Sequence, residues 1–337
     1  MRFLFLGKGE NEASSRYRIQ PISKCLAEAG HGVEFLGTEM SLLDKLLLLG
    51  RLSNYDLVFV QRKLFPIWFI HFLAKQAKRL VFDFDDAIFL KSSGEDSATR
   101  HKKFQATCRR ADLILAGNEY LAREATQFSD KVIVVPTTVD TETYVVETAK
   151  SVETAMSAET AEGSNITLVW IGSSSTRRYL DMLTPVLDQL GDRISNLSLK
   201  VIADFDLHLD RLNVNNVTWS ESGEVPELTS SHIGIAPMIN NGWTRGKCAL
   251  KVIQYMAAGL PVVSDRCGAN QEVIIEGETG FLADTEHDWL EAIKQLVENP
   301  DLRTQMGEAG RTRARQHYDM QTVRLATASR LVELCSK

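Results

Sequence analysis

The chain has 337 residues, of which 44% are hydrophobic and 24% are charged, and its formal net charge at pH 7 is -6. This ordinary composition excludes a chain that is disordered throughout, a collagen-like chain and a general nucleic-acid binder, so no nucleic-acid partner is expected. The length exceeds the size at which one hydrophobic core usually stops growing. We therefore expect two domains.

The five cysteines lie far apart, without the paired spacing that zinc and redox motifs need, at Cys25, Cys108, Cys248, Cys267 and Cys335. This spacing predicts reduced thiols and a cytoplasmic location. The apolar run at the start of the chain is too short for a signal peptide. No run approaches the roughly 20 apolar residues of a membrane span.

The first half alternates short apolar runs with segments of helix length. The expected strands are residues 3–6, 33–36, 57–60, 80–84, 113–116 and 132–135. A helix is expected over residues 18–29, where glycines end it. Nearly continuous apolar strands separated by helices predict a parallel sheet that is covered on both faces.

The same alternation restarts in the second half. The expected strands there are residues 166–172, 197–203, 217–219, 233–238 and 262–264. The fold class is therefore α/β, with two Rossmann-like, doubly wound domains that face a cleft. The ligand site of such sheets is expected at the carboxyl ends of the strands.

Four segments follow from this pattern. They are an N-terminal domain (1–145), a linker (146–165), a second domain (166–317) and a C-terminal helix (318–337). In the linker, Glu-Thr-Ala opens three successive units of six residues, and large apolar residues are few. This composition predicts a solvated, partly disordered insert. The last segment has the apolar spacing of an amphipathic helix.

A glycine-rich loop, residues 240–248, follows one apolar run and opens a helix over residues 249–258. Backbone N–H groups without partners, the positive end of the helix dipole and Lys247 therefore meet in one place. Such a place suits a diphosphate. The residues expected to bind it are Gly246, Lys247, Cys248 and Ala249.

The segment that follows has a recognisable order: Gln-Tyr-Met-Ala-Ala-Gly-Leu-Pro-Val-Val over residues 254–263, then Gly268, Glu272 and a second glycine-containing run at 277–282. It resembles the donor-binding half of the family 4, or group 1, glycosyltransferases. The resemblance implies the B-type glycosyltransferase fold, with no cofactor and no metal. It places the acceptor on the N-terminal domain (1–145) and the nucleotide sugar on the second domain (166–317), and it implies that the C-terminal helix (318–337) crosses back to the N-terminal domain. It also implies a retaining, hexosyltransferase-type enzyme that moves a sugar from a nucleotide diphosphate sugar to a saccharide or lipid-linked acceptor, as in surface or exopolysaccharide synthesis.

The chain departs from the family at two positions. The family usually shows two glutamates eight positions apart, and Gly246 and Gln254 stand there. The Gln254 amide can still accept from one ribose hydroxyl and donate to another. Without the first glutamate, the backbone around Gly246 and the Lys247 side chain are left to contact the sugar. Two alternatives therefore stay open: a non-catalytic nucleotide-sugar-binding partner of the same fold, and a sugar-nucleotide epimerase.

A second loop also precedes a helix, over residues 172–178, and it offers Gly172, Ser173, Arg177 and Arg178 to an anion. The resembled family often carries an arginine and a lysine in this loop toward the donor diphosphate. Arg177 or Arg178 matches the lysine by position, and Ser173 stands where the other basic residue would be. The alternative is that both arginines are ordinary surface residues.

Asp85 and Asp86 follow the expected strand 80–84, where the resembled family often places His-Asp near the acceptor. With Asp83 they form a group of three carboxylates, which can raise a pKa or recruit Mg²⁺. The resemblance favours direct hydrogen bonds from Asp85 and Asp86 to acceptor or sugar hydroxyls, without a metal. Capping of the next helix is the structural alternative.

The first loop offers Gly9, Arg16 and Arg18 as acceptor-side residues. Its glycines suit a close ligand, but their spacing is not the dinucleotide fingerprint, which disfavours nicotinamide chemistry. Residues 66–79 run from aromatic side chains to a basic end. This segment predicts either peripheral contact with an anionic membrane, at its inner face, or core packing with cations at a helix C-terminus.

Overall fold

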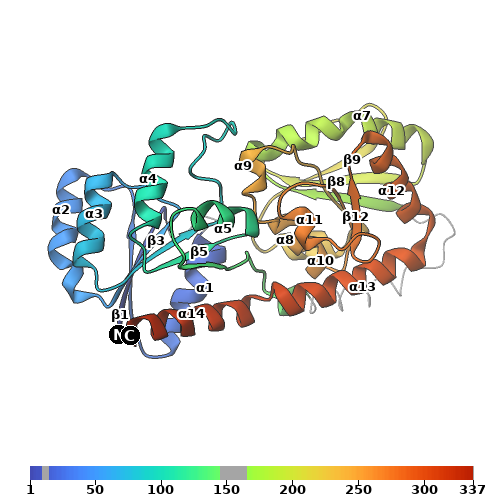
Figure 1. Cartoon of the computed structure of the whole chain (residues 1–337). Helices are drawn as coiled ribbons and strands as arrows, with labels where there is room; N and C mark the ends of the chain where they lie inside the picture. The colour runs from blue at the N-terminus through green and yellow to red at the C-terminus, as the bar shows by residue number, and fades with distance from the viewer. Residues whose placement is uncertain (10–14, 145–164, 337) are drawn as a thin grey trace. The chain divides into compact units, whose positions relative to one another are not determined.

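A computed structural model describes residues 1–9, 15–144 and 165–336 (Figure 1). The chain divides into two compact units. Unit 1 contains Met1–Thr138, Asn241–Cys248 and Met320–Lys337, and unit 2 contains Val139–Asn240 and Ala249–Asp319. The repetitive insert predicted for residues 146–165 lies almost wholly outside the described residues.

Unit 1 is built on a parallel sheet. Its strands within the described residues are β1 (Arg2–Gly7), β2 (Gly32–Gly37), β3 (Leu57–Gln61), β4 (Leu80–Phe84), β5 (Leu113–Ala116) and β6 (Val132–Val134). They lie in the order β2-β1-β3-β4-β5-β6. Neighbouring strands are parallel throughout.

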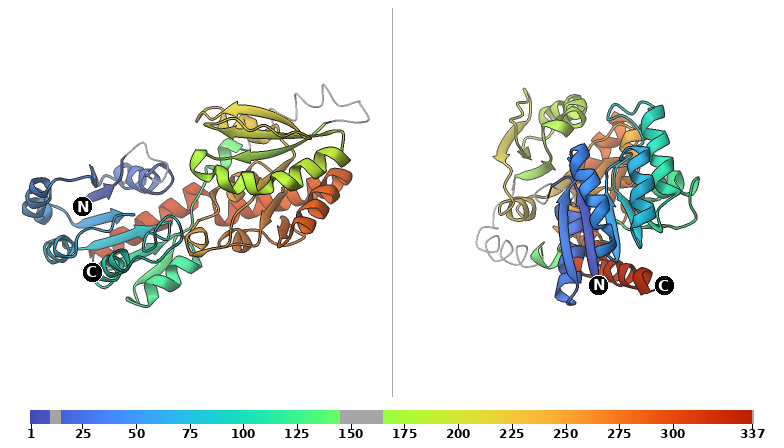
Figure 2. Two further views of the ribbon diagram at one scale, coloured as in Figure 1. Left: turned by 90° about the horizontal axis from the view of Figure 1, so that it is seen from above. Right: turned by 90° about the vertical axis from the view of Figure 1, so that its left-hand side faces the viewer.

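Helices cover both faces of this sheet (Figures 1 and 2). They are α1 (Gln20–Glu28), α2 (Leu42–Arg51), α3 (Ile67–Gln76), α4 (Ala98–Cys108), α5 (Glu119–Thr126) and α14 (Met320–Ser336). The short helix α9 (Gly242–Arg245) also belongs to unit 1. Side chains of successive strand residues point to opposite faces of the sheet, so each apolar strand contributes side chains to two hydrophobic cores. One core packs under α2, α3, α4 and α5, and the other under α1 and α14.

Unit 2 repeats the plan with its own sheet. Its strands are β7 (Ile166–Ile171), β8 (Leu197–Ala203), β9 (Asn213–Thr218), β10 (Ile233–Ala236), β11 (Val262–Asp265) and β12 (Gly280–Ala283). They are parallel and lie in the order β12-β11-β10-β7-β8-β9. Its helices are α7 (Arg177–Arg193), α8 (Glu224–Thr229), α10 (Leu250–Ala257), α11 (Asn270–Val273), α12 (Glu286–Glu298) and α13 (Pro300–His317).

The predicted fold class is confirmed: two Rossmann-like parallel sheets, each covered by helices. In each sheet the strand order reverses direction at one point, between β1 and β3 in unit 1 and between β7 and β10 in unit 2. Ligands of open α/β sheets bind beside the carboxyl ends of the strands at such a switch point. The order therefore says where in each unit a ligand site is expected.

Some predicted boundaries differ from the structure, for local reasons. A π-helical turn (Ser15–Ile19) precedes α1, so the predicted first helix starts later. The strand expected at residues 217–219 begins earlier, at Asn213. It lies at the sheet edge, where the exposed residues Asn213 and Asn215 interrupt the apolar pattern. β12, inside the predicted second glycine loop, was missed. None of the described helices is long and apolar enough to cross a bilayer.

Candidate functional site

The carboxyl end of β4 begins with a buried ion pair. Arg18 Nε lies 3.1 and 3.0 Å from the two carboxylate oxygens of Asp83, and Arg18 Nη1 donates to the Val135 carbonyl at 2.9 Å. Both side chains are buried. The charge of Asp83 and its hydrogen bonds raise the pKa of Arg18 above its ordinary value, although burial alone would lower it. This pair ties the first loop to the sheet, so the structure gives Arg18 a structural role.

Asp85 and Asp86 follow the same strand and face two cations. Arg62 Nε lies 3.2 Å from Asp85 Oδ1, and Arg62 also pairs with Asp86. Lys247 Nζ lies 2.8 Å from Asp86 Oδ1. Arg62 has a φ of 50°, a left-handed conformation that is strained for a residue other than glycine. The expected repulsion between neighbouring carboxylates is therefore offset by an arginine and a lysine.

The protonation of this cluster follows from its burial. Burial raises the pKa of the Asp86 carboxyl, and the charges of Lys247 and Arg62 oppose the shift. Cys248 Sγ lies 3.3 Å from the Asp85 carbonyl oxygen. Burial and the nearby carboxylates raise the pKa of the Cys248 thiol far above neutral pH. Cys248 is thus a protonated, half-buried thiol and is unsuited to act as a nucleophile.

A metal site does not account for these carboxylates. Among the described residues, no group of three or more His, Cys, Asp or Glu side chains is placed to hold a metal ion. Asp83, Asp85 and Asp86, the alternative Mg²⁺ ligands, each pair with an arginine instead. The positive charge that a metal would supply is already provided by side chains.

The glycine-rich loop belongs to unit 1, whereas the sequence analysis expected it in the second domain. Asn118 Nδ2 donates to the carbonyls of Arg245 and Lys247, at 3.1 and 3.0 Å. A Cβ at Gly246 would lie 2.6 Å from the backbone nitrogen of Ala87. These close approaches hold the loop beside the end of β4, and they explain why Lys247 meets Asp86.

In unit 2, the loop after β7 occupies the switch point. Ser174 donates to the Asp204 carboxylate through both its backbone N–H, at 2.6 Å, and its hydroxyl, at 3.0 Å. Ser173 caps the short turn before α7 through Thr176. Gly172 is half-buried, and a Cβ there would collide with the Trp170 ring. The loop is therefore fixed in place, and Gly172 leaves its backbone approachable.

A lysine that the sequence analysis missed lies against this loop. Lys251, in the first turn of α10, has its Nζ 3.9 Å from the centre of the Trp170 ring. The same Nζ lies 3.5 Å from Thr176 Oγ1, and a Cβ at Gly172 would lie 2.8 Å from it. A cation above an aromatic face is held electrostatically. Unit 2 thus brings a lysine, a glycine backbone and hydroxyl groups together at its switch point.

The two arginines of this loop are more exposed. Arg177 pairs with Asp181 one turn along α7, with Nε 3.3 Å from Oδ1, and its guanidinium lies 4.9 Å from the centre of the Phe205 ring. Arg178 Nη2 donates to the Tyr179 hydroxyl at 2.8 Å. An exposed ion pair within one helix contributes little stability, so Arg177 can leave Asp181 and bind an anion at a small cost in free energy.

Gln254 is buried in α10 and is already hydrogen-bonded. Its Nε2 donates to Glu224 Oε1 at 2.7 Å, and Trp219 Nε1 donates to the other oxygen of Glu224 at 2.9 Å. Glu224 stands at the first position of α8 and is buried. The carboxylate that the family carries on the helix of Gln254 is absent there, but Glu224 supplies one beside it.

The other predicted donor residues sit at helix ends. Ala249 precedes α10 with a φ of 53°, so the helix starts at Leu250 rather than at Ala249. Gly268 lies in the loop after β11 with a φ of 51°. Glu272 lies on the short α11, where its side chain is exposed.

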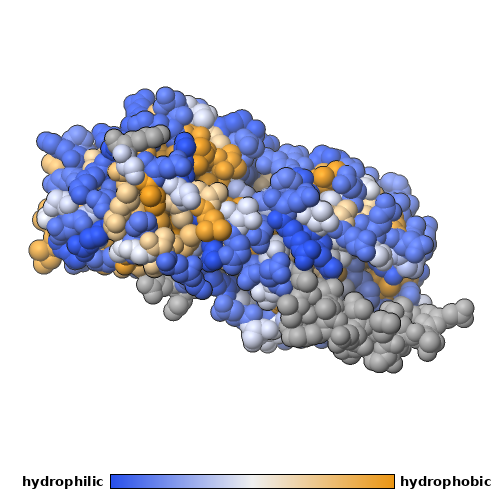
Figure 3. Space-filling view, turned by 90° about the horizontal axis from the view of Figure 1, so that it is seen from below, coloured by the Kyte–Doolittle hydropathy of each residue, from blue (hydrophilic) through white to orange (hydrophobic). Residues whose placement is uncertain are grey.

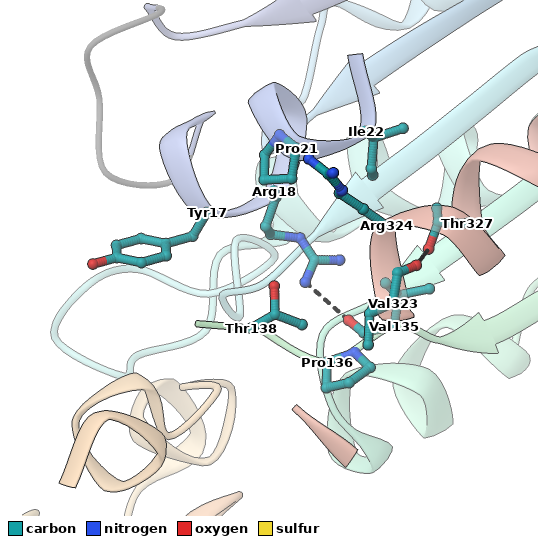
Figure 4. Close-up of a pocket in the computed structure, with 10 residues that line it drawn as sticks. All are labelled: Tyr17, Arg18, Pro21, Ile22, Val135, Pro136, Thr138, Val323, Arg324 and Thr327. Atoms are coloured by element: carbon teal, nitrogen blue, oxygen red, sulfur yellow. Dashed lines mark hydrogen bonds between the residues drawn. The ribbon is translucent and has the colours of Figure 1, made fainter. Parts of the chain in front are cut away.

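Of the three predicted first-loop residues, Arg18 lines a small cavity in unit 1. Figure 4 shows the Arg18 guanidinium directed at the Val135 carbonyl, with Thr138 and Arg324 near it and the Tyr17 ring directed away. The cavity volume is about 10 Å³, enough for one water molecule. Arg16 lies over the neighbouring tyrosine ring, with its guanidinium carbon 5.0 Å from the ring centre, and Gly9 is half-buried. This cavity is too small for a sugar ring.

Comparison with known proteins supports a common family. Residues 152–313 match the family model described as glycosyl transferases group 1. The chain is similar to D-inositol 3-phosphate glycosyltransferase of Pseudarthrobacter chlorophenolicus, with 29% identity over 142 residues, covering 40% of this chain. The enzyme of that name from Corynebacterium diphtheriae is 40% identical over 63 residues, which is 18% of this chain. The matches span 31% and 14% of these relatives, so the chain aligns with less than a third of their length.

Solved structures share the whole architecture. Sucrose-phosphate synthase from Thermosynechococcus elongatus superposes with a TM-score of 0.77 at 13% identity and covers 100% of both chains. Anabaena HepE in complex with UDP gives 0.75 at 16% identity and covers 99% of this chain and 100% of HepE. A glycosyltransferase from Rickettsia africae gives 0.76 at 13%, with 100% and 98% covered. At these identities the likeness establishes the fold. Residues 152–313 therefore match the group 1 glycosyltransferase family, the family that the sequence motifs resemble, and the chain has the B-type glycosyltransferase fold.

Proposed function

We propose that this protein transfers a sugar from a nucleotide diphosphate sugar to a saccharide or lipid-linked acceptor, with retention of the anomeric configuration. One observation carries the proposal: Lys251 and the loop after β7 meet at the switch point of unit 2, inside the segment that matches the family. A uridine diphosphate sugar is the first donor to test, because the similar HepE structures contain UDP and UDP-glucose.

In this proposal, Lys251 and Arg177 bind the donor diphosphate. Transfer leaves a growing negative charge on the departing diphosphate, and fixed cations and backbone N–H groups stabilise it most in the transition state. Lys251 is fixed by the ring of Trp170, so little reorganisation is needed when the charge develops. Gly172 lets an oxygen of the diphosphate approach the loop backbone.

Glu224 and Gln254 are proposed to hold the nucleotide ribose. A carboxylate accepts hydrogen bonds from the two ribose hydroxyls, and in the family a glutamate at the position of Gln254 does so. Here the carboxylate comes from α8, and Gln254 orients it through the 2.7 Å hydrogen bond. The ribose function would thus be kept although the glutamate has moved to another element.

Asp85 and Asp86 are proposed to have different roles on the acceptor side. Asp85 is the more exposed of the two carboxylates, so it is placed to accept a hydrogen bond from an acceptor or sugar hydroxyl. Asp86 is buried between Arg62 and Lys247 and holds both cations in position. The lysine and the arginine then keep negative charge from accumulating where the hydroxyl reacts.

The proposal is tested by incubating the purified protein with UDP-glucose and other nucleotide sugars, with saccharide and lipid-linked acceptors. Release of nucleoside diphosphate that depends on an acceptor is expected, and NMR of the product should show the anomeric configuration of the donor. Inversion at the anomeric carbon would contradict the retaining mechanism. Donor binding without turnover on any acceptor would contradict the enzyme assignment.

One observation favours a second function, a non-catalytic protein that binds a nucleotide sugar. Gly246 has no side chain where the family usually places its first glutamate, and backbone contacts leave no room for one. Such a protein would bind the donor and release no diphosphate from it. Epimerisation of the donor without any acceptor would instead identify a sugar-nucleotide epimerase.

A further inference from the structure

Helix α2 has an apolar face that nothing in its own unit covers. Leu48 and Leu49 point into the core of unit 1. The other side of the helix exposes four more leucines, at Leu42, Leu43, Leu46 and Leu47. A surface helix of a soluble domain normally turns polar residues to this side, so α2 is apolar on two sides.

Helix α3 repeats this arrangement. Phe69, Ile70 and Leu73 are buried in the same core. Ile67, Trp68 and Phe72 lie on the outer side. The large apolar side chains exposed on the two helices have between 39% and 65% of their surface accessible.

The two exposed sides lie on neighbouring helices. Helices α2 and α3 pack against each other and lie side by side in Figure 1. Figure 3, which draws one side of the molecule, also shows hydrophobic residues gathered over unit 1, at the left of that view. We name the surface formed by the seven exposed side chains of α2 and α3 the α2–α3 face. Large continuous apolar surfaces on a soluble protein mark places where it binds something.

The charge around the α2–α3 face is positive. The segment 62–79, which contains α3, holds five lysines and arginines and no aspartate or glutamate, but Arg62 pairs with Asp85 and Asp86 and Lys78 pairs with Asp56. Among the described residues, Lys63 and Lys75 form no ion pair. On α2 the charges balance, since Asp44 lies beside Lys45 and Glu34 pairs with Arg51, so Lys63 and Lys75 carry the positive charge near the face.

We propose that the α2–α3 face docks on an anionic lipid surface. Leucine, isoleucine and phenylalanine side chains would enter the boundary of the acyl chains, Trp68 would lie at headgroup level, and Lys63 and Lys75 would meet lipid phosphates. A symmetric dimer through the same face is disfavoured, because a two-fold axis would bring the positive rim of one copy against that of the other. The proposal does not depend on glycosyl transfer, since vesicle binding can be measured without a donor.

Vesicle sedimentation tests the proposal. The protein should bind vesicles that contain roughly 30% phosphatidylglycerol more tightly than vesicles of phosphatidylcholine alone. Leu43→Glu with Leu47→Glu should lower the partition coefficient about tenfold or more, because two charges would enter the apolar boundary. Lys63→Glu with Lys75→Glu should remove the preference for anionic lipid. Leu325→Glu is the control, since Leu325 is an exposed leucine of α14 and lies outside the face.

A second readout follows the face directly. Tryptophan emission should shift to shorter wavelength on vesicles, and Trp68→Phe should lose most of that shift while unfolding at the same temperature as the wild type. Equal vesicle binding by the wild type and the glutamate variants would overturn the proposal. So would a wild-type dimer in light scattering that the Leu43→Glu, Leu47→Glu variant dissociates, because a second copy would then cover the face.

Discussion

At the scale of single residues, the structure shows how a missing carboxylate is replaced. Gln254 stands where the family usually has a glutamate, and its amide donates to Glu224 at 2.7 Å in a buried setting. The sequence around Gln254 predicted its helix, because the motif is local. It could not predict Glu224 as the partner, which lies 30 residues away and has no motif of its own.

Restoring the family residue should therefore harm this protein. Gln254→Glu replaces a hydrogen bond by two adjacent buried carboxylates, and we expect a loss of about 1 to 3 kcal/mol in the free energy of unfolding at neutral pH. Repulsion raises the pKa of the new carboxyl in the folded state above its unfolded value, so the native state binds the extra proton more readily. The loss should shrink as the pH falls toward the unfolded pKa, where the proton is bound in both states.

Urea unfolding over a range of pH measures this effect. The double variant Glu224→Gln, Gln254→Glu exchanges the two groups and should recover most of the stability. A single variant as stable as the wild type at pH 7 would show that Glu224 and residue 254 do not interact as described.

Asp86 makes a prediction about the pH dependence of turnover. Burial raises its pKa, and the carboxylate form is the one that holds Lys247 and Arg62. As the pH falls through this raised pKa, Asp86 gains a proton and releases the cations. Turnover should consequently fall at a higher pH than an ordinary aspartate would cause, and Asp86→Asn should lower turnover and flatten this acid limb. If turnover of the variant fell with pH as it does in the wild type, a group other than Asp86 would cause the loss at acid pH.

At the scale of elements, the glycine-rich loop shows what local sequence predicts and what it misses. The loop and the helix after it were expected from their residues, and α10 follows as predicted, one residue later. The loop's place in unit 1 depends on Asn118 and on contact with Ala87, both more than 120 residues away. Lys251 was missed for a related reason, because only the fold brings it over Trp170.

The tight fit of this loop can be tested with one methyl group. In Gly246→Ala the new Cβ would lie 2.6 Å from the Ala87 backbone nitrogen, and backbone cannot rotate away as a side chain can. We expect a cost of about 1 to 3 kcal/mol in unfolding free energy, typical of overpacking. Gly50→Ala is the matched control, since no atom lies within 4 Å of its Cβ position, and a helical glycine gains up to about 1 kcal/mol from alanine. Equal unfolding midpoints in urea for the two variants would mean that the loop is not held there.

At the scale of the whole molecule, the apolar runs predicted most strands of both sheets, because parallel strands that are buried on both faces stay apolar. The exceptions are β9, a polar edge strand, and β12, which was missed. The division into units was harder to predict. Residues 241–248 join unit 1, although they lie late in the chain. Helix α14, for which the family resemblance implied a return to the N-terminal domain, also lies in unit 1. Such assignments rest on contacts between residues distant in sequence, which periodicity does not encode.

The central claim is that unit 2 binds a nucleoside diphosphate through Lys251 and the loop after β7. Titration calorimetry with UDP, alongside ADP and GDP to identify the preferred base, tests it most directly. Lys251→Met keeps an apolar stem on Trp170 and removes the charge. It should cost about 1.5 to 3 kcal/mol of diphosphate affinity, roughly 10- to 150-fold, and leave the affinity for the nucleoside unchanged. Lys247→Met is the matched lysine and should cost less, because Asp86 already engages Lys247 within unit 1. Unchanged diphosphate affinity in Lys251→Met would contradict the account.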